Sequence, residues 1–249
     1  MLAIIGGTGL TKLANLEITH RQVIRTPYGE PSGALTFGKI RDHGVVFLAR
    51  HGYGHTIPPH QVNYRANIWA LHSQKVTKVV SVASVGGIQP DLGPGAIVLP
   101  DQIIDYTYGR ENTYFDGGGK PVTHMDFTQP YCEAMRQKCM EAVFSAGENC
   151  IDGGVYAAVQ GPRLETKAEI DRLERDGATM VGMTGMPEAA LAKEIGLCYA
   201  AIGVVANYAA GRGSSAQRIS YQEIDAVLKQ GMQRVRTILE HLVELDNGD

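Results

Sequence analysis

The chain of 249 residues lacks the features of membrane, exported and nucleic-acid-binding proteins. No apolar run approaches the roughly 20 residues that a membrane-spanning helix needs, and the strand-like start has no basic leader or cleavage site. Lys and Arg are scattered and the formal net charge is −3, so no basic surface is available to attract nucleic acid. We therefore expect a cytoplasmic protein that acts on a small molecule, without nucleic-acid or membrane partners.

Cysteine is scarce, and no two cysteines form a C-x-x-C pair. The four are Cys132, Cys139, Cys150 and Cys198, which are widely spaced. Zinc sites and redox motifs need closer pairs than these. We therefore expect four reduced thiols that are packed in a cytoplasmic protein.

Short apolar, β-branched runs alternate with amphipathic segments along the whole chain. This pattern predicts a single α/β domain, residues 1–249, with a mixed sheet covered by helices on both faces. The apolar runs predict strands at 2–5, 44–49, 78–83, 96–100, 154–158, 180–182 and 199–206. The amphipathic segments predict helices at 62–73, 129–146, 166–176, 187–195 and 221–245. The polar stretch 109–126 predicts a long loop, which in a compact domain is usually functional.

The first candidate site follows the first strand, where the sequence reads GGTGL from Gly6 to Leu10. The glycines let backbone N–H groups turn toward an anion, and Thr8 adds a hydroxyl donor. The loop lacks the Lys of a P-loop and the spacing of a dinucleotide fingerprint. By itself it predicts either a tight turn or a phosphate site.

The second candidate site is ARHGYGH, from Ala49 to His55. Arg50 offers a planar fork of donors for phosphate oxygens, and His51 can add another donor. A surface ion pair is an equally good explanation for an isolated Arg50. His51 and His55 lie on a glycine-rich loop without a nearby carboxylate, which argues against a metal site.

The third candidate site is MTGMPE, which ends one predicted strand and begins the next helix. Pro187 suits the first helical turn. Thr184 can cap that turn or donate to an anion, and Met183 can pack against an uncharged ligand face or in the core.

Taken together, five motifs resemble the nucleoside phosphorylase family, in particular its methylthioadenosine phosphorylase branch. They are GGTGL, ARHG with HTIPPHQVNYRANIWAL, Gly161-Pro162-Arg163, MTGMPE and LAKEIGLCYA, in that order. The resemblance implies a mixed sheet or distorted barrel flanked by helices, and a homotrimer. It also implies an enzyme without a cofactor, which uses inorganic phosphate as co-substrate to release a purine and form an α-pentose 1-phosphate.

The resemblance also implies roles for individual residues. It assigns phosphate binding to Thr8, Arg50, His51, Ala83, Ser84 and Thr184. It places Met183 against the ribose, and it places His124 in the 5′ pocket of a neighbouring subunit. The family stacks the purine on an aromatic side chain, whereas this chain has Leu164 at that position.

Asn207 ends the apolar run 199–206 and predicts which base is bound. The adenine-specific branch has Asp-Tyr-Asp where this chain has Asn207, Tyr208 and Ala209. An amide both donates and accepts hydrogen bonds, whereas a carboxylate only accepts. We therefore expect a 6-oxopurine, with Asn207 donating to N7 or O6 of the leaving base while His51 helps to hold phosphate.

The segment 219–224 corresponds to the part of the family that lines the 5′ position. It contains no histidine, and Ile219, Tyr221 and Ile224 can form an apolar pocket for a methylthio group. The expected substrate is therefore 5′-methylthioinosine, handled in purine and methylthio salvage. A 5′-methylthioadenosine phosphorylase, a general 6-oxopurine nucleoside phosphorylase, a nucleosidase and a non-enzymatic nucleoside-binding protein remain alternatives, and His55 and His60 have no assigned role.

Overall fold

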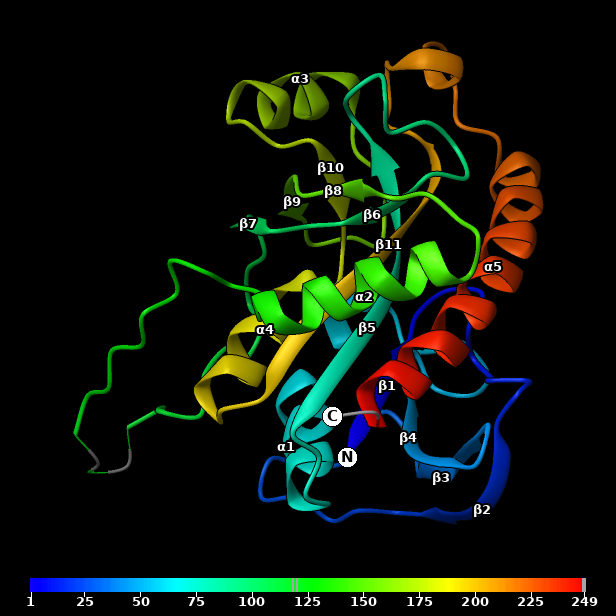
Figure 1. Ribbon diagram of the computed structural model, residues 1–249. Helices are drawn as coiled ribbons and strands as arrows, with labels where there is room; N and C mark the ends of the chain where they lie inside the picture. The colour runs from blue at the N-terminus through cyan, green and yellow to red at the C-terminus, as the bar shows by residue number, and fades with distance from the viewer. Residues whose placement is uncertain (118, 120, 248–249) are drawn as a thin grey trace.

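The computed structural model describes residues 1–117, 119 and 121–247, and contains a mixed sheet of eleven strands between layers of helices (Figure 1). This is the α/β architecture that the alternating pattern predicted. The strands are β1 (Leu2–Gly6), β2 (Glu17–Gln22), β3 (Leu35–Ile40), β4 (His43–Ala49), β5 (Lys78–Gly87), β6 (Ile97–Leu99), β7 (Gln102–Asp105), β8 (Ile151–Asp152), β9 (Val155–Ala158), β10 (Met180–Gly182) and β11 (Cys198–Tyr208). The helices are α1 (Tyr64–Ser73), α2 (Glu133–Ser145), α3 (Lys167–Arg175), α4 (Gly185–Glu194) and α5 (Tyr221–Asn247), with short 3-10 turns at Pro59–Gln61 and Gly213–Ser215.

The sheet branches at the central strand β5, which pairs with β1, β10 and β11. Strands follow the order β2-β3-β4-β1-β5-β10-β9-β7, while β11 pairs with β5 and β6, and β6 also pairs with β8. The pairs β1–β4, β1–β5 and β5–β11 are parallel. Their carboxyl ends therefore meet at one edge of the sheet, where open α/β sheets bind ligands.

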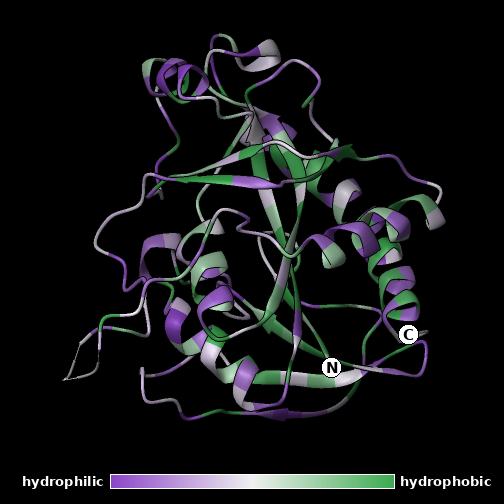
Figure 2. Ribbon diagram, turned by 60° about the vertical axis from the view of Figure 1, so that its left-hand side comes forward, coloured by the Kyte–Doolittle hydropathy of each residue, from purple (hydrophilic) through white to green (hydrophobic). Residues whose placement is uncertain are grey.

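Both faces of the sheet are buried, as alternate residues of β1 show. Ala3 and Ile5 belong to the apolar cluster that includes α1 and α4, whereas Leu2 and Ile4 belong to the cluster with α2 and α5. Successive side chains of a strand point to opposite faces, so a run that is apolar throughout needs helices on both sides. Figure 2 shows the hydrophobic residues concentrated on these central strands. Among the described residues, no helix is long and apolar enough to cross a membrane.

Every predicted strand and helix has a counterpart within a few residues, but four strands were not predicted. They are β2, β3, β7 and β8. All six residues of β2 are exposed at the sheet edge, so its polar sequence, EITHRQ, has no apolar period that could reveal it. In α4, Met186 has non-helical backbone angles, so the regular helix begins at Pro187, as predicted.

The described residues between 109 and 126 form an arm that extends away from the body of the molecule (Figure 1). The described residues of the arm contain no helix or strand. Its base is anchored: Thr113 Oγ1 donates to Glu194 over 2.6 Å, and Arg110 Nη1 donates to the carbonyls of Met183 (2.9 Å) and Met186 (2.6 Å). The arm thus leaves the body directly beside the segment that carries Met183.

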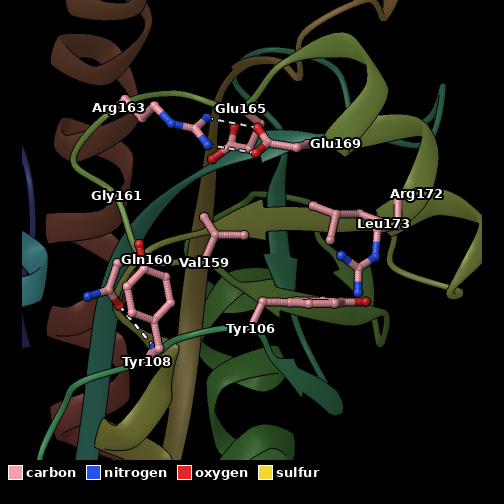
Figure 3. A pocket seen from close by; sticks show the side chains of 10 residues that line it. All are labelled: Tyr106, Tyr108, Val159, Gln160, Gly161, Arg163, Glu165, Glu169, Arg172 and Leu173. Carbon is pink, nitrogen blue, oxygen red and sulfur yellow. Dashed lines mark hydrogen bonds and ion pairs between the residues drawn. The ribbon is translucent and has the colours of Figure 1, made fainter.

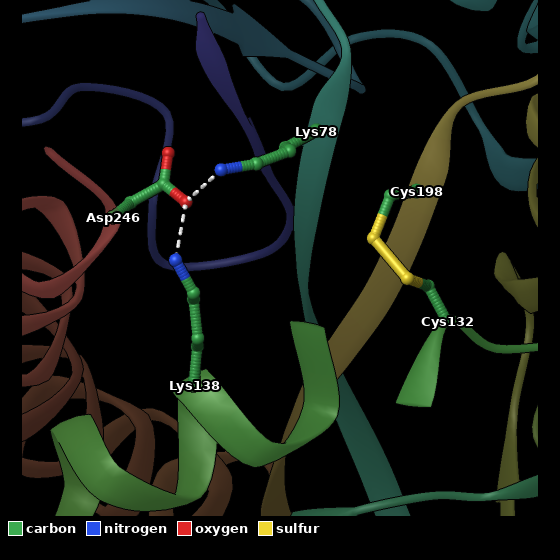
Figure 4. Close-up of a disulfide and its surroundings, with 5 residues drawn as sticks. All are labelled: Lys78, Cys132, Lys138, Cys198 and Asp246. Carbon is green, nitrogen blue, oxygen red and sulfur yellow. Dashed lines mark hydrogen bonds and ion pairs between the residues drawn. A yellow bond between two sulfur atoms is a disulfide. The ribbon is translucent and has the colours of Figure 1, made fainter. Parts of the chain in front are cut away.

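The prediction of four reduced thiols is wrong for two of them, because Cys132 and Cys198 form a disulfide (Figure 4). Cys132 precedes α2 and Cys198 begins β11, and their Cα atoms are 5.2 Å apart. Their separation of 66 residues gave no sign of this contact. Cys139 and Cys150 are free thiols, and burial raises the pKa of Cys139 to about 12. Nearby, Lys78 and Lys138 both contact the Asp246 carboxylate, which anchors the end of α5.

Candidate active site

A cavity of about 650 Å³ lies at the edge of the sheet where β1, β4, β5 and β11 end. The parallel register brings together loops that are far apart in the sequence. Most of the predicted site residues line this cavity: Thr8, Arg50, His51, Ala83, Ser84, Leu164, Met183, Thr184, Asn207, Ala209, Tyr221 and Ile224.

Arg50 lies at one end of the cavity and is not part of a surface ion pair. Its side chain is only 1 % exposed and pairs with an equally buried carboxylate, Glu188. Arg50 Nε and Nη2 donate to the two Glu188 oxygens over 2.6 and 2.8 Å, which is the bidentate geometry that guanidinium favours. The pair holds the pKa of Arg50 above its ordinary value, against the opposing effect of burial.

The glycine loop after β1 approaches this guanidinium closely. A Cβ atom on Gly7 would lie 2.6 Å from the Val82 carbonyl oxygen and 2.8 Å from Arg50 Nη1. Only glycine therefore fits, and the backbone at Gly7 can border the space in front of Nη1. Next to it, Thr8 Oγ1 lies 3.1 Å from His55 Nε2. The loop predicted as turn or phosphate site thus faces the cavity together with Arg50.

His51 is buried, and its two ring nitrogens have different surroundings. Burial, followed by the charge of Arg50, lowers the pKa of His51 to about 4. Its Nδ1 lies 2.8 Å from the Ile57 carbonyl oxygen. A carbonyl only accepts, so the neutral ring carries its proton on Nδ1 and Nε2 is an acceptor.

Met183 and Thr184 follow β10 and line the cavity. Thr184 is buried at the start of α4, but its side chain makes no capping hydrogen bond. Gly161 has a φ of +63°, and a Cβ atom there would lie 2.5 Å from Met183 Sδ. Glycine at 161 therefore lets Met183 pack tightly against the loop that follows β9.

Asn207, Ala209, Leu164 and Glu165 also line the cavity. Asn207 pairs with Gly86, four residues further along β5 than Val82, whose carbonyl accepts from Arg50, so Asn207 and Arg50 mark two ends of the cavity. Asn207 Nδ2 donates to the Tyr208 carbonyl over 2.6 Å. Sequence reasoning missed Glu165, although it directly follows the predicted Leu164. Burial raises the pKa of the Glu165 carboxyl, and perturbed carboxyls in a cleft are candidates for ligand binding.

Three predicted residues lie outside this cavity. Tyr208 turns its hydroxyl to the Pro90 carbonyl over 2.9 Å, because β11 is a strand and its successive side chains point to opposite faces. Ile219 precedes α5 and does not line the cavity, whereas Leu228, one turn after Ile224, does. His124 lies exposed on the arm, away from the cavity of its own chain.

Leu228 was missed because the helical period from Ile224 was not followed to the next turn. Beside Tyr221 and Ile224, it gives α5 an apolar wall, to which the exposed Asp225 adds one carboxylate. Among the described residues, no group of three or more His, Cys, Asp or Glu side chains could hold a metal ion.

A second cavity of about 400 Å³ adjoins the first, and Glu165 lines both cavities (Figure 3). Arg163 and Glu169 form a bidentate ion pair at one side, with distances of 2.8 and 2.6 Å. Tyr106 lies at the other side under the guanidinium of Arg172. Arg163 and Arg172 are both in exposed ion pairs, with Glu169 and Asp176, whereas the Arg50–Glu188 pair of the first cavity is buried.

Residues 1–244 match the family model described as Phosphorylase superfamily. A probable S-methyl-5'-thioinosine phosphorylase of Pseudomonas syringae pv. tomato is 50 % identical over 241 residues, which cover 97 % of each chain. A 6-oxopurine nucleoside phosphorylase of Pyrococcus furiosus is 42 % identical, over 92 % of this chain and 86 % of the relative. Methylthioadenosine phosphorylase from Schistosoma mansoni in complex with adenine superposes with a TM-score of 0.94 at 33 % identity, over 100 % of this chain and 92 % of that one.

Proposed function

Because this chain belongs to the phosphorylase superfamily, we propose that it catalyses phosphorolysis of S-methyl-5'-thioinosine to hypoxanthine and 5-methylthioribose 1-phosphate. One observation carries the proposal: a single cavity joins an anion-binding end at Arg50 to a base-binding end at Asn207 and Glu165. The names of relatives that are about half identical support the same substrate.

The anion-binding end suits inorganic phosphate. Arg50 Nη1, the Thr8 and Thr184 hydroxyls and the glycine loop supply donors. Hydrogen phosphate also carries one P–OH group, which donates to the His51 Nε2 acceptor. Phosphate held in this way is the nucleophile, so we propose that the reaction needs no cofactor and no covalent enzyme intermediate.

The chemistry follows the movement of charge. Breaking the glycosidic bond leaves positive charge on the pentose, because the electron pair of the bond passes to the purine. Phosphate neutralises the developing cation and attacks C1′, and Met183 packs against the sugar. A pre-positioned nucleophile and fixed donors lower the barrier because neither has to be reorganised during the reaction.

The base end matches a lactam. Hypoxanthine presents an N1–H donor beside a C6 carbonyl acceptor, and the Glu165 carboxylate and the Asn207 amide can pair with such an edge. Adenine instead presents an N1 acceptor beside an N6 amine. Two acceptors, N1 of adenine and the carboxylate, would then face each other in a partly buried site. Unpaired polar groups of this kind produce strong discrimination against adenine.

The α5 wall decides the 5′ preference. Ile224 and Leu228 suit a methylthio group. One observation favours a second candidate, a general 6-oxopurine nucleoside phosphorylase: Asp225 lines the same wall and could accept a hydrogen bond from a 5′-hydroxyl.

Initial rates with methylthioinosine, methylthioadenosine and inosine, each with and without phosphate, test the proposal. We expect hypoxanthine from methylthioinosine only when phosphate is present. Preference for methylthioadenosine would refute the role of Asn207, and equal rates with inosine would establish the second candidate. Release of base without phosphate would indicate a nucleosidase, and binding without turnover a non-enzymatic protein.

We further propose that the protein is a cytoplasmic homotrimer in which the arm completes a neighbouring 5′ pocket. Val122 on the arm and Tyr108 directly before it are 80 % and 72 % exposed, so both side chains are available for burial by another subunit. Light scattering should give a mass of three chains. His124→Ala should raise KM for the nucleoside without changing KM for phosphate, and a monomer with full activity would contradict the proposal.

A further inference from the structure

Glu188 is a buried carboxylate that the reaction proposed above does not use directly. It lies in α4, its side chain is 1 % exposed, and it does not line the cavity. A buried charge is costly unless it is paired and hydrogen-bonded. Its only charged partner among the described residues is Arg50, the one guanidinium at the anion-binding end.

The donors of Arg50 are almost fully occupied. A guanidinium has five N–H groups. Nε and one Nη2–H donate to Glu188, the second Nη2–H donates to Ser81 Oγ over 2.5 Å, and one Nη1–H donates to the Val82 carbonyl over 3.2 Å. One Nη1–H is left without an acceptor in the described part of the chain, and Nη1 is the atom beside Gly7.

A second side chain holds Glu188 itself. Tyr199 in β11 is buried, and its hydroxyl donates to Glu188 Oε1 over 2.8 Å. The Glu188 carboxylate is therefore fixed from both sides, by Tyr199 and by Arg50. Since β11, α4 and the end of β4 all contribute, the orientation of the guanidinium is set by the packing of three elements.

The pair also changes the charge of the site. Glu188 offsets the single positive charge of Arg50, and His51 is neutral at pH 7. An anion is then held by directed N–H and O–H groups with little net positive charge behind them. Such a site can position phosphate without retaining the sugar phosphate product too strongly.

We propose that Glu188 is a positioning residue, which aims the remaining Nη1–H of Arg50 at phosphate and limits anion affinity so that the product leaves. This inference rests on the proposed phosphorolysis. It predicts that the position and the charge of the carboxylate have separable effects, on kcat and on phosphate affinity respectively.

Two substitutions separate these effects. Glu188→Gln keeps the shape and removes the charge, so phosphate Kd by calorimetry and phosphate KM should fall about tenfold because Arg50 is no longer offset. Its kcat should fall about 100-fold, because the amide cannot accept from both Nε and Nη2 and the guanidinium shifts. Glu188→Asp keeps the charge and shortens the reach, so kcat should fall while phosphate Kd stays near the wild-type value.

One further test variant and one control variant complete the experiment. Tyr199→Phe should lower kcat several-fold with unchanged phosphate Kd. Asp152→Asn weakens an ion pair of Arg136, another buried arginine, away from the cavity, and should leave kcat and Kd unchanged. Wild-type kcat in the Glu188 variants, or phosphate binding that weakens in Glu188→Gln, overturns the inference.

Should Glu188→Gln fail to fold, Glu188→Asp and Tyr199→Phe decide the question, and wild-type kcat in both overturns it. Failure of the proposed function is a different result. In that case the wild-type protein itself releases no base in the presence of phosphate.

Discussion

Thr8 Oγ1 and His55 Nε2 lie 3.1 Å apart, although 47 residues separate them in the sequence. The His55 ring also lies 4.8 Å from the His51 ring, between their centroids. His55 thus contacts a hydroxyl at the proposed anion-binding end, and it is the last residue of the ARHGYGH motif that contains Arg50 and His51. The contact gives His55, whose role the sequence left open, a position at the proposed phosphate site.

Replacing His55 by alanine should weaken phosphate binding. Loss of the hydrogen bond that orients the Thr8 hydroxyl costs about 1 kcal/mol, so phosphate KM should rise about fivefold. Nucleoside KM should not change. Initial rates at varied phosphate and varied nucleoside measure both constants, and Thr8→Val is the matched variant. If the effects of His55→Ala and Thr8→Val add up in the double variant, the two residues do not share a role.

Asn207→Asp should weaken turnover of the 6-oxopurine nucleoside. A carboxylate cannot donate to N7 or O6 of the leaving base, and the loss of such a bond in a buried site costs about 3 kcal/mol, or about 100-fold in kcat/KM. Parallel assays with methylthioinosine and methylthioadenosine measure this. Unchanged turnover of methylthioinosine would remove Asn207 from base recognition.

Stability should depend on pH through His51. Its pKa is about 4 in the folded protein and 6.5 ordinarily, so between these values the unfolded chain binds a proton that the folded chain does not. The free energy of unfolding should therefore fall as the pH is lowered from 6.5 to 4, by at most about 3 kcal/mol. Urea unfolding at several pH values measures this dependence.

The difference between wild type and His51→Gln isolates the histidine. Burial raises the pKa of Glu165, which contributes with the opposite sign just above its ordinary value, but this contribution is present in both proteins. Identical pH dependence of unfolding in the two proteins would show that His51 is not responsible.

The disulfide should contribute substantially to stability. Opening a loop of 66 residues lets the unfolded chain regain entropy worth about 4 kcal/mol. Cys198→Ser should therefore lower the free energy of unfolding by about this amount, whereas Cys150→Ala should have a smaller effect. Under denaturing conditions the wild type should expose two reactive thiols before reduction and four afterwards. Four thiols without reductant would contradict the bond.

Local patterns were sufficient for most of the fold. The β1 run is apolar at every position because both faces of the sheet are covered, and the charges spaced along α5 mark its outer face. Patterns failed at β2, in which every residue is exposed, and at the two-residue strand β8. In both cases, pairing with a distant strand forms the element, and no local period records it.

Most of the residues predicted for the site, including Thr8, Arg50 and Thr184 from the ordered motifs, line the cavity. The motifs did not reveal Glu165, because a carboxylate in a loop is ordinarily a solvated side chain, and only its burial at the cavity shows otherwise. They also misplaced Tyr208, whose neighbour Asn207 occupies the face toward the cavity.

By itself, the sequence determined the class of fold, the family and the glycine, arginine and threonine loops at the strand ends, because these depend on residue type and order along the chain. The tertiary structure alone decided what those groups can do. The parallel register brought the loops to one edge of the sheet, and Glu188 forms a bidentate ion pair with Arg50. The Ile57 carbonyl determines which nitrogen of His51 is protonated, and the packing of β11 on α2 brings Cys132 and Cys198 together. Each of these depends on distances between residues that are remote in the chain, and neither composition nor spacing carries that information.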